Sequence, residues 1–179
     1  MENICLGCGL CCDGTLFSYV ELCEADRAEE VARSGLTLHR VDGKLRFPQP
    51  CSASQEGCCT VYEKRPQACR DYRCTLRVEY DEGKVSVPSA RAFIANAIEL
   101  RDRIRPQLER LVGPPQPLSI HRLYRLADSK LALADAGIAE RRAHAELLLD
   151  MGALDVLLAR HFRGGALEAP EAAAEAAMK

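Results

Sequence analysis

Ten cysteines dominate the chemistry that this sequence of 179 residues can perform, and none lies beyond residue 74. They are Cys5, Cys8, Cys11, Cys12, Cys23, Cys51, Cys58, Cys59, Cys69 and Cys74. Cysteine thiolates are soft ligands that select zinc and iron–sulfur clusters. Because thiols seldom gather in this number without a metal or a set of disulfides, we expect one of the two to organise the N-terminal half of the chain.

The start of the chain favours a metal over disulfides. Disulfides persist in oxidising compartments, and the first residues show neither the basic nor the apolar segment of a secretion signal. We therefore expect a cytoplasmic protein whose clustered thiols bind metal. No apolar run is long enough to span a bilayer, so we expect no association with membranes.

The charge balance narrows the class of partner. A formal net charge of -2 leaves no global excess of basic residues that could neutralise phosphates. We expect no nucleic-acid partner. A protein partner or a redox partner is the prediction, and the sequence does not identify it.

The first four cysteines follow the pattern C-x-x-C-x-x-C-C from Cys5 to Cys12, with interleaved glycines that allow tight turns. Zinc sites usually take two ligands from each of two knuckles. Three thiolates at two-residue spacing plus a distant fourth are instead typical of ferredoxins. The pattern favours a 4Fe–4S centre. Zinc stays open as the alternative, because Asp13 stands where the ferredoxin run continues to a Cys-Pro.

The second group of cysteines extends the pattern. The segment from Cys59 to Tyr72 reads C-x-x-Y-x-x-R-P-x-x-C-R-x-Y. Together with C-x-x-C-x-x-C-C it resembles the cysteine-cluster family of zinc- or iron-chelating domains, whose functionally named members are flagellin lysine N-methylases. The resemblance covers residues 5–74 and not the remainder of the chain.

The resemblance implies a set of metal ligands. Cys74 is expected as an eighth ligand, in addition to seven cysteines that match the motif. Cys58, beside the matching Cys59, is expected to be supernumerary. Cys23 is expected to be a core thiol on a helix. Eight thiolates suit two sites of four ligands, or one site with spare redox-active cysteines. The seven cysteines that match the motif are Cys5, Cys8, Cys11, Cys12, Cys51, Cys59 and Cys69.

Charged and aromatic residues of the motif are candidates for contact with the metal centre. Four thiolates around zinc or around an oxidised four-iron cluster carry a net charge of about -2, which is costly to bury alone. We expect Arg65 and Arg70 to offset it, with Arg73 as a further candidate, and Tyr62 and Tyr72 to pack over the site. The alternative is that they are ordinary surface arginines and core tyrosines.

The elements that must position these residues predict an α+β fold. A small metal-binding module with short hairpins is expected at residues 1–88, a helical extension packed on it at 89–167, and a disordered tail at 168–179. In the extension, Pro106 is expected to kink or divide the first helix. Ser119 is expected to cap a second helix that Gly137 stops.

Local signals predict three elements inside the module. A capping box at residues 18–21 predicts a helix that ends at Gly35. Asp42-Gly43 predicts a hairpin between residues 36–41 and 44–47. Residues 81–83 predict a second hairpin in the same way.

The function that we predict is a metal-binding protein with an iron–sulfur centre in a redox or modification role. The alternative is a structural zinc module whose helical region binds another protein. A further alternative, implied by the resemblance alone, is an enzyme related to the lysine N-methylases. Neither a glycine-rich nucleotide fingerprint nor a C-x-x-x-C-x-x-C radical loop accompanies it, so catalysis stays open.

Overall fold

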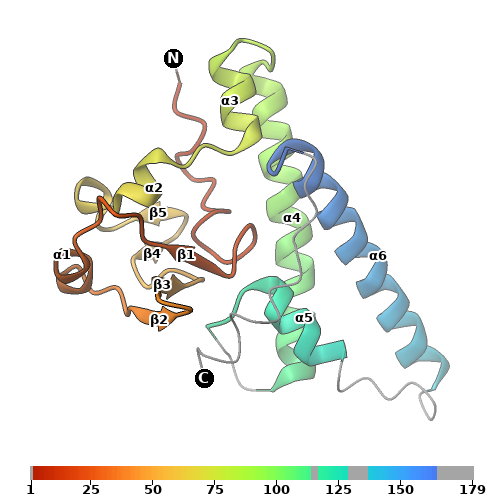
Figure 1. Ribbon diagram of the computed structural model, residues 1–179. Coiled ribbons are helices and arrows are strands. Elements are labelled where there is room, and N and C mark those ends of the chain that lie inside the picture. Colours follow the sequence, from red (N-terminus) through yellow and green to blue (C-terminus); the bar gives the residue numbers. More distant parts are fainter. Residues whose placement is uncertain (1, 114–116, 129–136, 165–179) are drawn as a thin grey trace.

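A computed structural model gives the structure of the chain and describes residues 2–113, 117–128 and 137–164. The fold is α+β, with short strands and helices in the N-terminal half beside three further helices (Figure 1). None of the described helices is long and apolar enough to cross a membrane. The elements are β1 (Tyr19–Glu21), α1 (Ala28–Arg33), β2 (His39–Val41), β3 (Lys44–Pro48), β4 (Ser54–Gln55), β5 (Cys58–Cys59), the 3-10 helix η1 (Tyr62–Lys64), α2 (Gln67–Asp71), α3 (Thr75–Asp81), α4 (Val87–Val112), α5 (Ile120–Asp128) and α6 (Ile138–His161).

Two small antiparallel sheets shape the N-terminal half. In the first sheet β3 lies between β1 and β2. The turn from β2 to β3 is formed by Asp42 and Gly43, both with positive φ, as a tight two-residue hairpin requires. The predicted hairpin is therefore confirmed. The second sheet pairs β4 with β5 and sets Ser54 opposite Cys59.

The helix expected after the capping box is shorter than predicted. The residues after Ser18 form β1 instead, because they pair with β3 and set Val20 opposite Phe47. Ser18 caps no helix. Its buried hydroxyl lies 2.7 Å from the hydroxyl of Ser119. Helix α1 ends before Gly35 as expected, and Gly35 takes a positive φ of 89°.

The second predicted hairpin, across residues 81–83, is wrong. Helix α3 precedes this turn and α4 follows it. Leu76 and Tyr80 are four residues apart and both buried, which is the spacing of one helix face. The side chain of Ser86 caps α4 by accepting a hydrogen bond from the N–H of Ser89. Apolar segments as short as these do not distinguish strand from helix by periodicity alone.

Two expectations for the helical half have clear outcomes. Helix α4 continues through Pro106 as one element of 26 residues and is not divided there. The predicted cap of α5 is confirmed, because the hydroxyl of Ser119 accepts a hydrogen bond from the N–H of Arg122 at 3.3 Å. Residues 129–136, into which this helix was expected to continue, and the expected tail at 168–179 lie outside the described residues.

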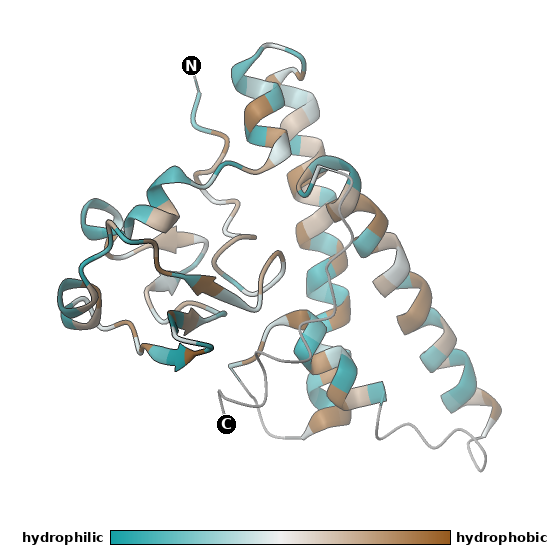
Figure 2. Ribbon diagram, in the orientation of Figure 1, coloured by the Kyte–Doolittle hydropathy of each residue, from teal (hydrophilic) through white to brown (hydrophobic). Residues whose placement is uncertain are grey.

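The main hydrophobic core lies where α4 packs against α5 and α6 (Figure 1). Ile104, Leu123 and Leu154 contribute one fully buried side chain from each of these helices. Apolar and polar residues alternate along α4 and α6 in Figure 2, as in helices that bury one face. The core therefore depends on the pairing of these three helices.

This core extends into the first cysteine loop. Ile4, Leu10 and Leu16 are buried in the same hydrophobic cluster as the helices. Arg101 and Arg105 of α4 also bind Asp13 in the loop, the first through the carboxylate and the second through the carbonyl oxygen at 3.1 Å. Helix α4 thus holds the loop by both apolar and charged contacts.

We predict that Leu154→Ala lowers the free energy of unfolding by about 2–5 kcal/mol, because it opens a cavity between α4 and α6. The matched control is Leu149→Ala on the same helix, whose side chain is 74% exposed. It should change stability by less than about 0.5 kcal/mol. Urea unfolding of both variants tests this, and equal losses would contradict the described packing.

Candidate metal centre

The first cysteine loop is packed tightly against the turn between β4 and β5. Gly9 has a φ of 67°, and a Cβ there would lie 2.9 Å from the Cα of Gly57. The carbonyl oxygen of Gly9 accepts hydrogen bonds from the N–H groups of Cys12 and Asp13 at 2.8 and 3.0 Å. Only glycine fits this close approach. It brings the first loop next to the second cysteine segment.

Cys5, Cys8, Cys11 and Cys74 form what we call the first group. All but Cys5 pack against the helical core. The thiol of Cys8 interacts electrostatically with those of Cys74 and Cys5, and Cys11 interacts with Cys8 and Cys5. Burial, reinforced by these neighbours, raises the pKa of Cys8 to about 12. Helix α3 begins directly after Cys74 and so brings it to a loop about seventy positions earlier.

Cys12, Cys51, Cys59 and Cys69 form the second group. Cys51 and Cys69 pack against a separate small hydrophobic cluster that includes Phe47. The N–H of Cys51 donates to the carbonyl oxygen of Cys12 at 2.7 Å. The thiol of Cys69 interacts with the other three, and burial raises its pKa to about 12. The second group therefore belongs to the sheet region and not to the helical core.

The two groups meet at consecutive residues. The sulfur atoms of Cys11 and Cys12 lie 3.7 Å apart. Their hydrogen bond, together with burial, raises the pKa of Cys11, and the same hydrogen bond lowers the pKa of Cys12. One peptide bond thus separates the two groups of thiols.

The thiols of each group lie near one another but are not arranged as the ligands of a metal ion. Across the described parts of the chain, no three or more histidine, cysteine, aspartate or glutamate side chains are arranged so that they could hold a metal ion. All ten cysteines are free thiols. The grouping therefore rests on packing and on electrostatic contact between thiols, not on coordination geometry.

Backbone N–H groups near the sulfur atoms lower the pKa of thiols in both groups. Such N–H groups favour the thiolate over the thiol, and in iron–sulfur proteins they tune the reduction potential. They are those of Leu10 at Cys8, of Ala53 and Ser54 at Cys51, and of Leu76 and Arg77 at Cys74.

One arginine acts on each group. Arg65 stacks over the ring of Tyr62 at 3.6 Å, and its charge favours the thiolate of Cys12. In the first group, Nη1 of Arg77 lies 3.9 Å from the sulfur of Cys5. The sequence analysis missed Arg77. It follows Cys74 by three positions, and this spacing has meaning only once residues 75–81 are a helix.

The other arginines of the motif brace the backbone. Arg70 donates to the carbonyl oxygens of Arg65 and Glu63 at 2.9 and 2.8 Å. Arg73 donates to those of Arg70 and Tyr72 at 2.6 and 2.9 Å. These bonds hold the segment from η1 to the end of α2 in shape, and Cys69 lies within it.

The two tyrosines of the motif differ in environment. Tyr72 packs edge-to-face on Phe17 with ring centroids 5.0 Å apart. Tyr72 is 36% exposed, and the burial of the rest of its side chain raises its pKa. The nearby thiols of Cys74 and Cys11 add to this shift, so Tyr72 lies beside the first group. Tyr62 is 49% exposed and carries Arg65 on its face.

The remaining cysteines lie outside both groups. Cys58 is exposed on β5, and adjacent strand residues point to opposite faces, so Cys59 alone turns toward the second group. The expectation that Cys23 is a core thiol on a helix is wrong. Cys23 is exposed in the turn before α1, and its sulfur donates to the carboxylate of Asp26 at 3.3 Å.

Comparison of the chain with protein-family models, with curated proteins and with solved structures finds no match.

Asp26 links α1 to the helix that carries Cys69. Its carboxylate accepts hydrogen bonds from the N–H groups of Gln67 and Ala68, at the start of α2. We predict that Asp26→Ala lowers the free energy of unfolding by about 1 kcal/mol, because it removes this cap. Glu24→Ala removes an exposed carboxylate two positions away and is the control. Equal stability of the two variants in urea unfolding would refute the capping role.

Proposed function

We propose that this chain binds two 4Fe–4S centres, one in each cysteine group, and uses them in electron transfer or in redox-dependent modification of a partner. The observation that carries the proposal is the division of eight thiols into two groups of four beside two separate hydrophobic clusters. Four thiolates are the ligand set of one such cluster. Free thiols in this number suit a reducing compartment, so a cytoplasmic location belongs to the proposal.

The spacing of the ligands supports iron over zinc. The first group takes three thiols from C-x-x-C-x-x-C, while the next cysteine of the run, Cys12, joins the other group. In two-cluster ferredoxins the last cysteine of the run likewise ligates the other cluster. The second group contains no C-x-x-C knuckle of the kind that zinc sites use.

The surrounding residues suit buried, negatively charged centres. Arg77 and Arg65 place one positive charge beside each group. The Phe17–Tyr72 pair lies beside the first group. Such a centre, when bound, supplies one-electron redox chemistry, and the chain's own part is to hold the sulfur ligands and to set their electrostatic environment.

A structural zinc protein is the second candidate function. One observation supports the protein-binding part of this function: Ile138, Leu149 and Val156 on α6 are 82%, 74% and 66% exposed, so this helix offers apolar side chains to another protein. Membership of the cysteine-cluster family is compatible with either function. The cysteine motif alone supports a relation to its lysine N-methylases.

Metal analysis separates iron from zinc. We expect protein purified without oxygen to contain about eight iron and eight acid-labile sulfide per chain, since each 4Fe–4S centre holds four of each. It should show a broad visible absorption that dithionite bleaches. Colourless protein with stoichiometric zinc would refute the iron–sulfur proposal and support the structural zinc protein.

The assignment of ligands makes a second prediction. Cys69→Ser and Cys74→Ser should each lose about half of the iron, because each removes a thiol from a different group. The double variant should lose nearly all of it. Cys58→Ser, which removes an exposed thiol outside both groups, should keep the full content.

The measurements are the iron content of each variant, its folding by circular dichroism, and its reduced clusters by electron paramagnetic resonance. A single variant that stays folded and loses all its iron would show that the eight cysteines serve one centre.

A further inference from the structure

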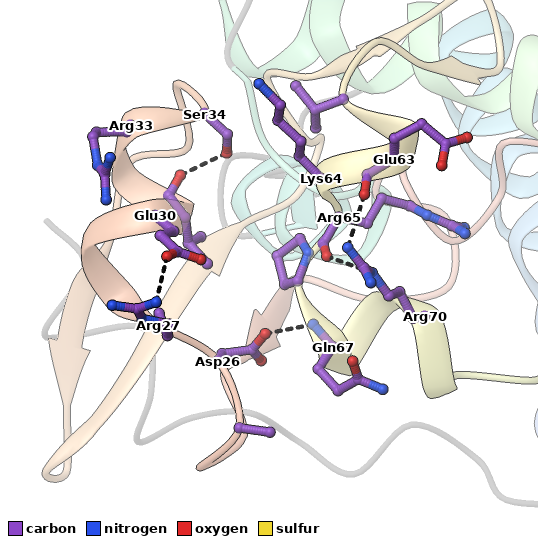
Figure 3. A pocket seen from close by; sticks show the side chains of 14 residues that line it. Asp26, Arg27, Glu30, Arg33, Ser34, Glu63, Lys64, Arg65, Gln67 and Arg70 are labelled. Carbon is purple, nitrogen blue, oxygen red and sulfur yellow. Dashed lines mark hydrogen bonds and ion pairs between the residues drawn. The ribbon is translucent and has the colours of Figure 1, made fainter.

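A groove lies between α1 and the segment from η1 to α2 (Figure 3). Its volume is about 770 Å³, which is the size of a site for one small molecule. Val31, Val61 and Pro66 provide an apolar part of the lining. Arg65 also lines the groove, and its charge acts on Cys12, so the groove lies near the second cysteine group although none of its lining residues is a cysteine.

Charged side chains make up most of the remaining lining, and cations outnumber carboxylates. The cationic residues are Arg27, Arg33, Lys64, Arg65 and Arg70. The carboxylates are Asp26, Glu30 and Glu63.

The three carboxylates do little to neutralise the groove. Asp26 is bound to the N–H groups at the start of α2. Glu30 pairs with Arg27 at 2.8 Å, so these two charges cancel. Figure 3 shows the carboxylate of Glu63 directed away from Lys64.

The charges of Arg33, Arg65 and Arg70 are not neutralised by their observed hydrogen-bond partners, because these partners are backbone carbonyl oxygens. Arg33 donates to the carbonyl oxygen of Glu29 at 3.2 Å, and Arg65 to that of Tyr62 at 2.9 Å. Arg70 likewise donates to carbonyl oxygens. A concave site with one sign of charge concentrates ions of the opposite sign, and guanidinium groups match the geometry of phosphate and carboxylate.

We propose that this groove binds a small molecule with several anionic oxygens, as phosphate or carboxylate groups, beside the second metal centre. The volume of the groove fits a small molecule better than a protein surface. The inference rests on the proposed function for the role of this ligand as substrate or effector, because Arg65 both lines the groove and acts on Cys12.

Calorimetric titration of the full chain with pyrophosphate and, separately, with citrate tests the proposal. We expect saturable binding of at least one of them, and the stronger of the two identifies phosphate or carboxylate as the preferred group. The double variant Arg33→Gln, Lys64→Gln should weaken that binding at least about tenfold, because it removes two charge-assisted contacts. Lys84→Gln is the control, since Lys84 is exposed outside the groove and pairs with Glu82.

No binding of either anion, or equal binding by the double variant, would overturn the proposal. Iron content measured on the same samples keeps the two proposals apart. Protein that binds pyrophosphate but holds zinc would sink the redox function and leave the groove assignment standing. Iron-loaded protein that binds neither anion would overturn the groove assignment and leave the redox function standing.

Discussion

The arrangement of this protein depends on how the negative charge of clustered thiols is compensated. Each group withdraws sulfur atoms from water, and burial and like charge both oppose formation of thiolates. The raised pKa values of Cys8 and Cys69 express that cost. In our proposal a metal centre removes it, because coordination replaces the proton on each sulfur with a shared positive charge. Backbone N–H groups, Arg65 and Arg77 lower the cost further but do not abolish it.

The two groups are supported by different parts of the fold. The first group lies against the helical core, and α4 holds its loop through Leu10 and through the contacts of Arg101 and Arg105 with Asp13. The second group lies against the small cluster around Phe47, which the sheet and α1 enclose. The helical half is thus part of the scaffold of the first group. The proposed centres would lie in these different surroundings and are therefore expected to differ in reduction potential.

The surroundings of the two groups also differ in which residues act on them. Arg65 acts on Cys12 of the second group and lines the cationic groove, whereas Cys8, Cys11 and Cys74 of the first group pack against the helical core. Cys11 and Cys12 join the two groups, because they are consecutive residues and their sulfur atoms are in contact. In our proposal a ligand in the groove therefore acts on the second centre through Arg65.

The sequence by itself determined the inventory of thiols, the β2–β3 hairpin and the cap of α5, because these depend on spacing within a few residues. It did not determine that residues 19–21 are a strand or that 75–81 are a helix, since pairing with β3 and packing on the core decide such short segments. Only the tertiary structure assigned Cys11 and Cys12 to different groups and brought Cys74 and Arg77 to the first loop. The reason is physical: electrostatic contact depends on distance in space, and long-range packing, not local pattern, sets that distance.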